Sequence, residues 1–339
     1  MKRCPGFRGL ALVFGLLAAP LLVAASEATP LESKTQALAQ AHAAVVGLRA
    51  VAVPDARSND TLGRERQGSG VVIDADGLVL TIGYLVLEAD EIDLLLEGDR
   101  VVPARVVAYD LASGFGLLQA LAPVKLPAVR LGKSADISTS EPLMISSGGD
   151  DAERSLARMV SRRGFSGYWE YHIEGALFTA PPRTDHSGAG LFNAKGELLG
   201  IGSLVVSDAL GADHPRLPGN MFVPIDLLKP ILGELRRDGA SRSSYRAWLG
   251  MNCVEQGGVI RVLRINRDSP AEDAGLLPGD RILSIDGVNV TDLETLYKTL
   301  WREAAQREVV LEIRRAGIAE TVRVQSVDRA RILSKPKGI

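Results

Sequence analysis

The chain has 339 residues, of which 46% are hydrophobic and 24% are charged, and its formal net charge is −2. This length is enough for two ordinary globular domains, and the composition indicates neither disorder nor a fibrous repeat. The near-balanced charge gives no sign of the basic stripe that draws in nucleic acid. We therefore expect a globular protein with no nucleic-acid partner.

Residues 1–26 have the layout of a secretory signal peptide. Basic residues come first, an apolar run from Gly9 to Val23 follows, and small residues lead into polar sequence. An uncleaved membrane anchor is the alternative, which the modest length of the run and Pro20 disfavour. We therefore expect export across the inner membrane and, in a Gram-negative source, a periplasmic protein without a stable membrane span.

The cysteines and histidines suggest no metal chemistry. Cys4 lies within the predicted signal, so Cys253 is alone in the exported chain and no internal disulfide can form. A lone cysteine in an apolar stretch is usually a small buried hydrophobe. No Cys/His spacing is typical of a metal site, and the sequence predicts no metal and no cofactor.

Short apolar strands dominate the first two thirds of the chain. A helical segment precedes them, and a turn at Asp74–Gly77 joins two early strands. Gly, Asp and Asn turns at close intervals predict an antiparallel barrel or sandwich rather than a βαβ fold. A closing helix is expected from about Asp226 to Arg237, and the polar residues 238–246 are predicted as a linker.

The rest of the chain predicts a small α+β module. Five or six short strands are interspersed with two helical pieces, Ser269–Leu276 and a segment that begins at Thr291. Thr291 and Glu294 have the spacing of a capping box, which marks the start of a helix. This helix has one apolar face, made by Leu293, Leu296, Tyr297, Leu300 and Trp301.

The order of motifs resembles the HtrA (DegP/DegS-like) family. "GSGVVIDADGLVLT", "LPAVRLGKSADISTSEPLMISSG" and "GNMFVPIDLLKPIL" are similar to segments of its protease domain, and "WLGM" and "SPAEDAGLLPGDRILSIDGVNVTDLETL" to its PDZ domain. The resemblance implies a mainly β fold: a trypsin-like double β-barrel at 35–237, a PDZ domain at 247–327 and a tail at 328–339.

The resemblance also locates the three positions of a catalytic triad. A trypsin-like mechanism needs a serine nucleophile, a histidine base and an aspartate that orients the histidine. Ser187 in "DHSGAGL" matches the nucleophile. The histidine position holds Tyr84 in "TIGYLV", and the aspartate position holds Gly114 in "DLASGFG".

The nucleophile motif itself departs from the family's G-N-S-G-G-P-L. Asp185 replaces the first glycine, whose N–H points into the oxyanion hole, and His186 follows it. A carboxylate there is expected to crowd the hole and to place negative charge beside a developing oxyanion. His42, His172, His186 and His214 match no triad position, and a neutral tyrosine with a pKa near 10 is a poor base. Ser187 is therefore predicted to be vestigial.

The PDZ-like module keeps what peptide binding needs. Strand addition requires an open sheet edge, backbone N–H groups for the terminal carboxylate and an apolar pocket. The resemblance assigns the carboxylate loop to "WLGM", Trp248, Leu249, Gly250 and Met251, and we expect Leu296 and Leu300 at the pocket wall. The alternative is that these leucines are plain core and that the protein's own linker closes the groove.

We therefore predict an exported HtrA-like pseudoprotease of protein quality control that binds peptide or unfolded-protein C-termini through its PDZ domain. One alternative is an active endopeptidase in which Ser187 uses a non-standard base. Another is a regulatory subunit of active homologues. The family's tendency to assemble makes a trimer or a hetero-oligomer the expected assembly.

Overall fold

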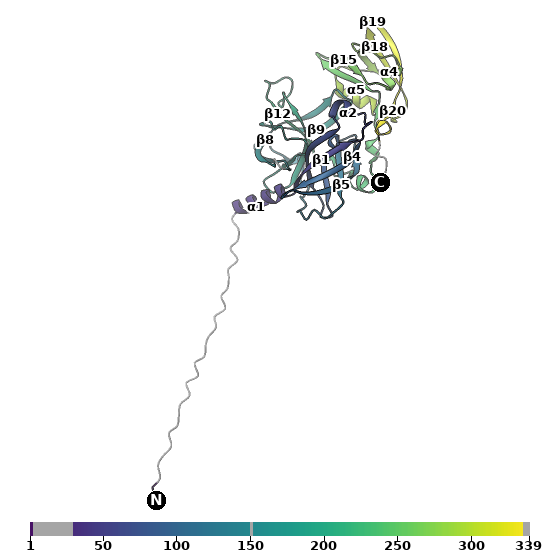
Figure 1. Cartoon of the computed structure of the whole chain (residues 1–339). Helices are drawn as coiled ribbons and strands as arrows, with labels where there is room; N and C mark the ends of the chain where they lie inside the picture. Colours follow the sequence, from purple (N-terminus) through teal and green to yellow (C-terminus); the bar gives the residue numbers. More distant parts are fainter. Residues whose placement is uncertain (3–29, 150–151, 335–339) are drawn as a thin grey trace.

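The computed structural model describes residues 1–2, 30–149 and 152–334. The predicted signal peptide lies almost wholly outside the described residues. Within the described part, no helix is both long and apolar enough to span a bilayer. The chain forms a larger double-barrel domain and a smaller C-terminal domain, which lies at the top of Figure 1.

The first barrel is closed, with the strand order β1-β2-β3-β6-β5-β4. Its strands are antiparallel, and their inward residues supply much of the main core, as the alternating burial of β1 illustrates. The strands are β1 (Val45–Ala52), β2 (Glu65–Val72), β3 (Leu78–Ile82), β4 (Ala89–Leu96), β5 (Arg100–Tyr109) and β6 (Phe115–Ala120). The turn at Asp74–Gly77 joins β2 to β3 as expected.

The second barrel is also closed, with the order β10-β11-β12-β9-β8-β7. Its strands are β7 (Pro142–Ser146), β8 (Arg154–Gly167), β9 (Tyr171–Ala180), β10 (Gly190–Phe192), β11 (Leu198–Val206) and β12 (Gly219–Pro224). Two closed barrels confirm the predicted mainly β architecture. Of these strands, β8 is the longest, and the β8–β9 hairpin ends beside the C-terminal domain.

Helices are few in the double-barrel domain. They are α1 (Pro30–Ala43), α2 (Asn59–Leu62) and α3 (Leu232–Asp238), with 3₁₀ turns at Gly83–Leu85, Ser134–Asp136 and Ile225–Leu227. The closing helix predicted from about Asp226 to Arg237 is present only in its second half, as α3. The chain instead makes a 3₁₀ turn and then α3, because Pro230 interrupts the backbone hydrogen bonding of a continuous helix.

The C-terminal domain has a main sheet of order β14-β15-β16-β18-β19. Its elements are β13 (Ala247–Trp248), β14 (Met251–Gln256), β15 (Val259–Ile265), α4 (Pro270–Asp273), β16 (Arg281–Ile285), β17 (Val288–Asn289), α5 (Leu293–Leu300), β18 (Glu308–Arg315), β19 (Ile318–Gln325) and β20 (Val327–Asp328). Both predicted helices exist, but the cap of α5 is Asp292 rather than Thr291, since the Asp292 carboxylate accepts the N–H of Thr295 at 2.7 Å.

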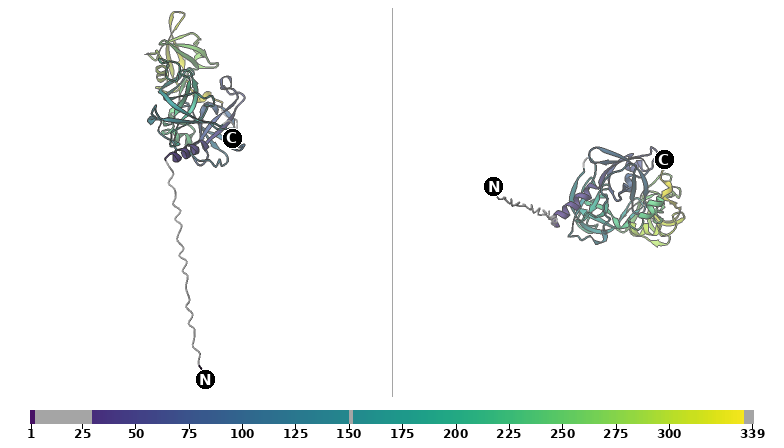
Figure 2. Two further views of the ribbon diagram at one scale, coloured as in Figure 1. Left: turned by 90° about the vertical axis from the view of Figure 1, so that its left-hand side faces the viewer. Right: turned by 90° about the horizontal axis from the view of Figure 1, so that it is seen from below.

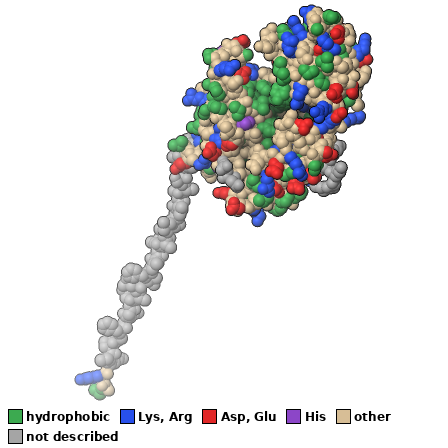
Figure 3. Space-filling view, turned by 45° about the horizontal axis from the view of Figure 1, so that its top comes forward, with side chains coloured by type: hydrophobic (Ala, Val, Ile, Leu, Met, Phe, Trp, Pro, Cys, Tyr) green, Lys and Arg blue, Asp and Glu red, His purple; other side chains and the backbone are tan. Residues whose placement is uncertain are grey.

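The two domains are packed against each other rather than merely linked. After β20 pairs with β13, a 3₁₀ turn at Arg329–Ile332 leads the chain back to the first barrel, where the N–H of Ser334 donates to Glu88 at 2.7 Å. Residues 328–334, predicted as part of a tail, thus lie along the domain junction. Figure 2 shows the compact pair from two further sides, and on the face in Figure 3 charges of both signs are interspersed.

Candidate functional site

Ser187 lies in the turn between β9 and β10, packed directly on β2. The N–H of Ser69 donates to the Ser187 carbonyl at 2.8 Å. Gly188, at φ +76°, has no room for a side chain, since a Cβ there would lie 1.9 Å from the Ser69 carbonyl oxygen. The serine-glycine pair is therefore fixed by backbone packing.

The hydroxyl of Tyr84 lies where a base would have to be. Its Oη is 2.8 Å from Ser187 Oγ and 2.8 Å from the carbonyl oxygen of Ser203. A phenol has one hydrogen and a carbonyl can only accept, so the arrangement that satisfies all groups has Tyr84 donating to Ser203 and Ser187 donating to Tyr84. Tyr84, the residue that the family resemblance predicts at the histidine position, thus hydrogen-bonds to Ser187 Oγ.

Tyr84 cannot take a proton from the serine at neutral pH. Burial raises the pKa of its phenol to about 12, although the hydrogen bond with Ser187 opposes this shift. A neutral phenol oxygen is a very weak base, so it can hold the serine hydroxyl but cannot activate it.

Gly114, which the family resemblance predicts at the aspartate position, lies next to the segment that holds Tyr84. Its carbonyl accepts the N–H of Gly83, the neighbour of Tyr84, at 2.6 Å. Gly114 has a φ of +78°, and a Cβ on it would lie 2.7 Å from the Oη of Tyr171. That phenol donates to the Ser113 carbonyl at 3.0 Å, so the space of an aspartate side chain is filled by a tyrosine.

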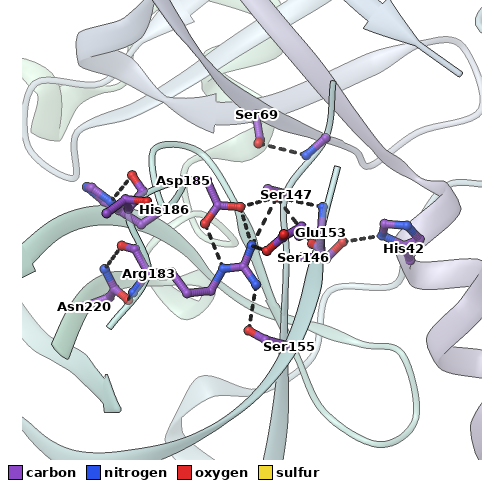
Figure 4. A network of polar contacts seen from close by, with 12 residues as sticks. His42, Ser69, Ser146, Ser147, Glu153, Ser155, Arg183, Asp185, His186 and Asn220 are labelled. Atoms are coloured by element: carbon purple, nitrogen blue, oxygen red, sulfur yellow. Dashed lines mark hydrogen bonds and ion pairs between the residues drawn. The ribbon is translucent and has the colours of Figure 1, made fainter. Parts of the chain in front are cut away.

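Both carboxylate oxygens of Asp185, which we expected to crowd the oxyanion hole, are held by neighbouring side chains. One carboxylate oxygen accepts from Arg183 Nε at 2.8 Å, and the other is bonded by Arg183 Nη2 and by Ser147 Oγ (Figure 4). Asp185 is also not among the described non-glycine residues with positive φ. Burial opposes ionisation of Asp185, but the Arg183 and Ser147 hydrogen bonds outweigh it and lower the pKa of the carboxyl. The negative charge is thus paired locally.

Arg183 is itself held firmly. Its side chain is 9% exposed, its Nη1 donates to Ser155 Oγ at 2.8 Å, and its backbone N–H donates to Asn220 Oδ1 at 2.7 Å. The turn before Ser187 is therefore organised by an arginine network rather than by a glycine.

The histidines have other partners. His186, half-buried next to Ser187, has its Nδ1 3.0 Å from the Thr184 carbonyl, and His42 and His172 contact Ser146 and Ser166. Burial lowers the pKa of all three imidazoles. Among the residues that the structure describes, Tyr84 is the side chain that hydrogen-bonds to Ser187 Oγ.

A second site lies at the domain junction, where the carboxylate of Glu170 is fully enclosed. Glu170 Oε1 accepts the N–H groups of Gly250 at 2.8 Å and Met251 at 3.0 Å, and Oε2 accepts that of Leu249 at 3.2 Å. These are the N–H groups of the "WLGM" segment. A side chain of the double-barrel domain therefore occupies the predicted carboxylate loop.

The backbone around Glu170 follows the same groove. The carbonyl of Tyr168 accepts the N–H of Cys253 on β14 at 2.9 Å, and the carbonyl of Gly167 accepts from Tyr297 Oη on α5 at 2.9 Å. The three-residue loop of the β8–β9 hairpin thus lies between β14 and α5, pairing once with the strand edge as an added strand would.

Two families of domains match the chain. A trypsin-like peptidase domain matches residues 68–201, and a PDZ domain matches residues 247–325. Two relatives are named "Probable periplasmic serine endoprotease DegP-like". The one from Hahella chejuensis is 28% identical over an alignment that covers 76% of this chain and 56% of the relative. The one from Ectopseudomonas mendocina is 30% identical over 77% of this chain and 58% of the relative. The chain belongs to the HtrA family.

Solved HtrA structures share the fold. "HtrA-type protease AlgW with decapeptide" is 23% identical and has a TM-score of 0.55, covering 87% of this chain and 98% of the other. This chain spans less than two thirds of the length of the DegP-like relatives above. The likeness supports the architecture, while the state of the catalytic site depends on the residues described above.

The remaining predicted residues of the PDZ domain are buried. Trp248 is 4% exposed, and Leu296 and Leu300 are fully enclosed in the PDZ core. Between them on α5, Tyr297 makes the hydrogen bonds to the hairpin. Their assignment to a pocket wall stays a prediction.

Glu170 was missed by the sequence reasoning. The sequence leaves open that the protein closes its own groove, but with the linker as the closing segment. The backbone conformation of Glu170 is a local signal that the structure reveals. Glu170 has a φ of +54° at the last position of a three-residue hairpin loop, a position that favours glycine. A glutamate in that conformation is unusual and points to a role for its side chain.

Proposed function

We propose that this HtrA-family protein is a pseudoprotease: a trypsin-like domain without turnover, joined to a PDZ domain that binds C-terminal carboxylates. The observation that carries the first half is the Tyr84–Ser187 hydrogen bond of 2.8 Å. It joins the serine to a phenol whose pKa is about 12, so the phenol stays protonated at neutral pH and is not available as a base. The absence of an aspartate at Gly114 supports it.

The magnitude of the loss leaves little room for turnover. In another serine protease, removing the triad serine or histidine lowers kcat on the order of a million-fold. Here the histidine and the aspartate are both replaced, so any residual rate comes from binding and the oxyanion hole alone.

The capture of Glu170 supports the second half of the proposal. Three backbone N–H groups of the PDZ loop already hold a carboxylate, which is the chemistry a peptide terminus would present. Because Glu170 fills that loop, a peptide binds only after the β8–β9 hairpin tip has left the groove. We therefore propose a closed resting state that opens to peptide.

A fluorophosphonate probe tests the pseudoprotease. The mature chain is expected to show no labelling and no degradation of unfolded casein, at levels equal to those of Ser187→Ala. Labelling that disappears in Ser187→Ala would contradict the proposal and favour an active endopeptidase with a non-standard base.

Location and assembly complete the proposal. The two relatives are named periplasmic, and the N-terminal pattern predicts export, so we propose a periplasmic location. A trimer, and a role as regulatory subunit of active homologues, stay predictions; sedimentation of the purified chain and co-purification with an active protease test them.

A further inference from the structure

Three side chains with metal-binding groups converge where α5 of the PDZ domain packs beside β9 of the double-barrel domain. One donor atom each from His172, Glu174 and Glu294 lies within 4.8 Å of the others. His172 and Glu174 are two residues apart on β9 and share a strand face, while Glu294 is in the first turn of α5. The cluster thus spans both domains.

The Nε2 atom of the His172 imidazole faces this cluster without a close hydrogen bond. His172 is 8% exposed, and its Nδ1 lies 2.8 Å from Ser166 Oγ, which fixes the ring. Its Nε2 has no hydrogen-bond partner among the described residues, and Oε1 of Glu174 is 3.5 Å away. A buried nitrogen without a partner costs free energy, so this arrangement needs an explanation.

The spacing is that of ligands around a small cation. Two donors bound to Zn²⁺ at tetrahedral angles lie about 3.4 Å apart, given bond lengths of about 2.0–2.1 Å. The 3.5 Å between His172 Nε2 and Glu174 Oε1 is close to this value. The Glu294 carboxylate, at the start of a helix and 45% exposed, is free to close the remaining distance.

The surroundings leave room for the ion and for water. Gly164 lies against the cluster: a Cβ there would come within 3.0 Å of Glu294 Oε2 and 3.2 Å of His172 Cε1. A cavity of about 410 Å³ opens beside it, lined among others by His172, Glu174 and Trp301. A fourth, solvent position on the metal would face this cavity.

Lys298 is the competing cation. Its ammonium pairs with Glu174 and, at 2.5 Å, with Glu294 Oε1, one helical turn away. The lysine neutralises the carboxylates but leaves His172 Nε2 without a hydrogen bond. Its side chain is 46% exposed and flexible, so a metal ion can displace it into solvent.

We propose that His172, Glu174 and Glu294 bind one divalent transition-metal ion, best matched by Zn²⁺, which displaces Lys298 and clamps α5 to β9. One imidazole and two carboxylates suit Zn²⁺ better than the oxygen-only ligand sets of Ca²⁺ or Mg²⁺. Ser166 is the outer partner that orients the imidazole. The site has no motif in the sequence, because its ligands come from a strand and a helix far apart in the chain.

A clamp at this place affects the peptide groove, because α5 is also the groove wall that holds the hairpin through Tyr297. When zinc binds only the closed state, in which the hairpin tip fills the groove, zinc lowers the affinity for peptide. Peptide then lowers the affinity for zinc by the same factor. This consequence rests on the proposed peptide-binding function; the metal site itself does not.

Zinc binding to the mature chain is measured by competition with a chromogenic chelator, without peptide. We expect one site whose affinity falls about tenfold or more in His172→Gln and in Glu294→Gln, and rises about tenfold in Lys298→Met, which removes the competing charge. A role of the cluster as a simple ion-pair network predicts no zinc binding in any of these proteins.

His214→Gln, which removes an exposed histidine outside the three-residue cluster, is the matched control and is expected to bind zinc like the parent. A cooperative unfolding transition of each metal-free variant, with a Tm close to that of the parent, shows that the variants are folded. A zinc-dependent rise in Tm is expected in the parent and not in His172→Gln. Absence of stoichiometric binding in Lys298→Met, or loss of binding in His214→Gln alone, would overturn the proposal.

Discussion

Glu170 Oε1 accepts the backbone N–H of Gly250 at 2.8 Å, so the carboxylate loop of the PDZ domain holds a side chain of the neighbouring domain. Burial raises the pKa of this carboxyl, and Arg329 and the loop N–H groups counteract that effect. Arg329 also donates to the Glu170 carbonyl at 2.7 Å, which fixes the hairpin tip from the other side. Glu170 is therefore held through both its side-chain carboxylate and its backbone carbonyl.

Glu170→Gly is expected to open the peptide groove. The change removes the carboxylate and gives a backbone at φ +54° its preferred residue, so the hairpin keeps its shape. Hydrogen bonds to a charged group contribute about 1.5–3 kcal/mol, which predicts a rise of roughly ten- to a hundredfold in peptide affinity. Fluorescence anisotropy with labelled peptides that end in an apolar residue and a free carboxylate measures it.

Asp99→Gly is the matched control, because Asp99 is an exposed acid with the same φ of +54° in the β4–β5 turn. It is expected to leave peptide affinity unchanged, and peptides with an amidated C-terminus are expected to bind neither protein well. Equal affinity of the parent and Glu170→Gly for free-carboxylate peptides would show that Glu170 does not gate the loop.

The two barrels were predictable from the sequence, and the groove occupant was not. Close spacing of apolar strands and turn residues is a local signal. The aligned motifs single out Tyr84, which hydrogen-bonds to Ser187, and Gly114, which hydrogen-bonds to the neighbour of Tyr84; the triad positions assigned to them stay a prediction. The contact of Glu170 with Gly250 instead joins segments far apart in the chain. Its one local trace, a glutamate in a left-handed conformation, becomes visible only when the backbone is known. The Arg183 pairing of Asp185 was missed because the family pattern has a glycine there.

Tyr84→His is expected not to restore proteolysis. A histidine at this position would lie near Ser187 Oγ, but nothing at Gly114 can fix its tautomer or stabilise its imidazolium. Casein turnover and fluorophosphonate labelling are expected to stay at the level of Ser187→Ala. Labelling that rises a hundredfold or more over Ser187→Ala would show that the missing aspartate matters less than we argue.

Gly114→Asp is expected to destabilise the fold by about 2 kcal/mol or more, since it adds a side chain at positive φ and drives a Cβ to 2.7 Å from Tyr171 Oη. Tyr171→Phe removes that oxygen, so the double variant is expected to lose less than the sum of the two single changes. Urea denaturation of the four proteins measures the coupling. Strict additivity would mean that the tyrosine is not what excludes an aspartate.

Alkaline pH is expected not to turn Tyr84 into a base for Ser187. An unfolded tyrosine ionises near pH 10, whereas burial raises the pKa of Tyr84 to about 12 in the folded chain. The folded state therefore favours the protonated phenol: its contribution to stability is fully present below pH 10 and is lost as the pH rises through about 12. Fluorophosphonate labelling at pH 7, 9 and 10 should stay flat and equal to that of Ser187→Ala, and Tyr84→Phe, which lacks the hydroxyl, should behave the same. Labelling that grows with a midpoint near pH 10 and disappears in Tyr84→Phe would mean that a phenolate activates the serine and that the trypsin-like domain is a latent enzyme.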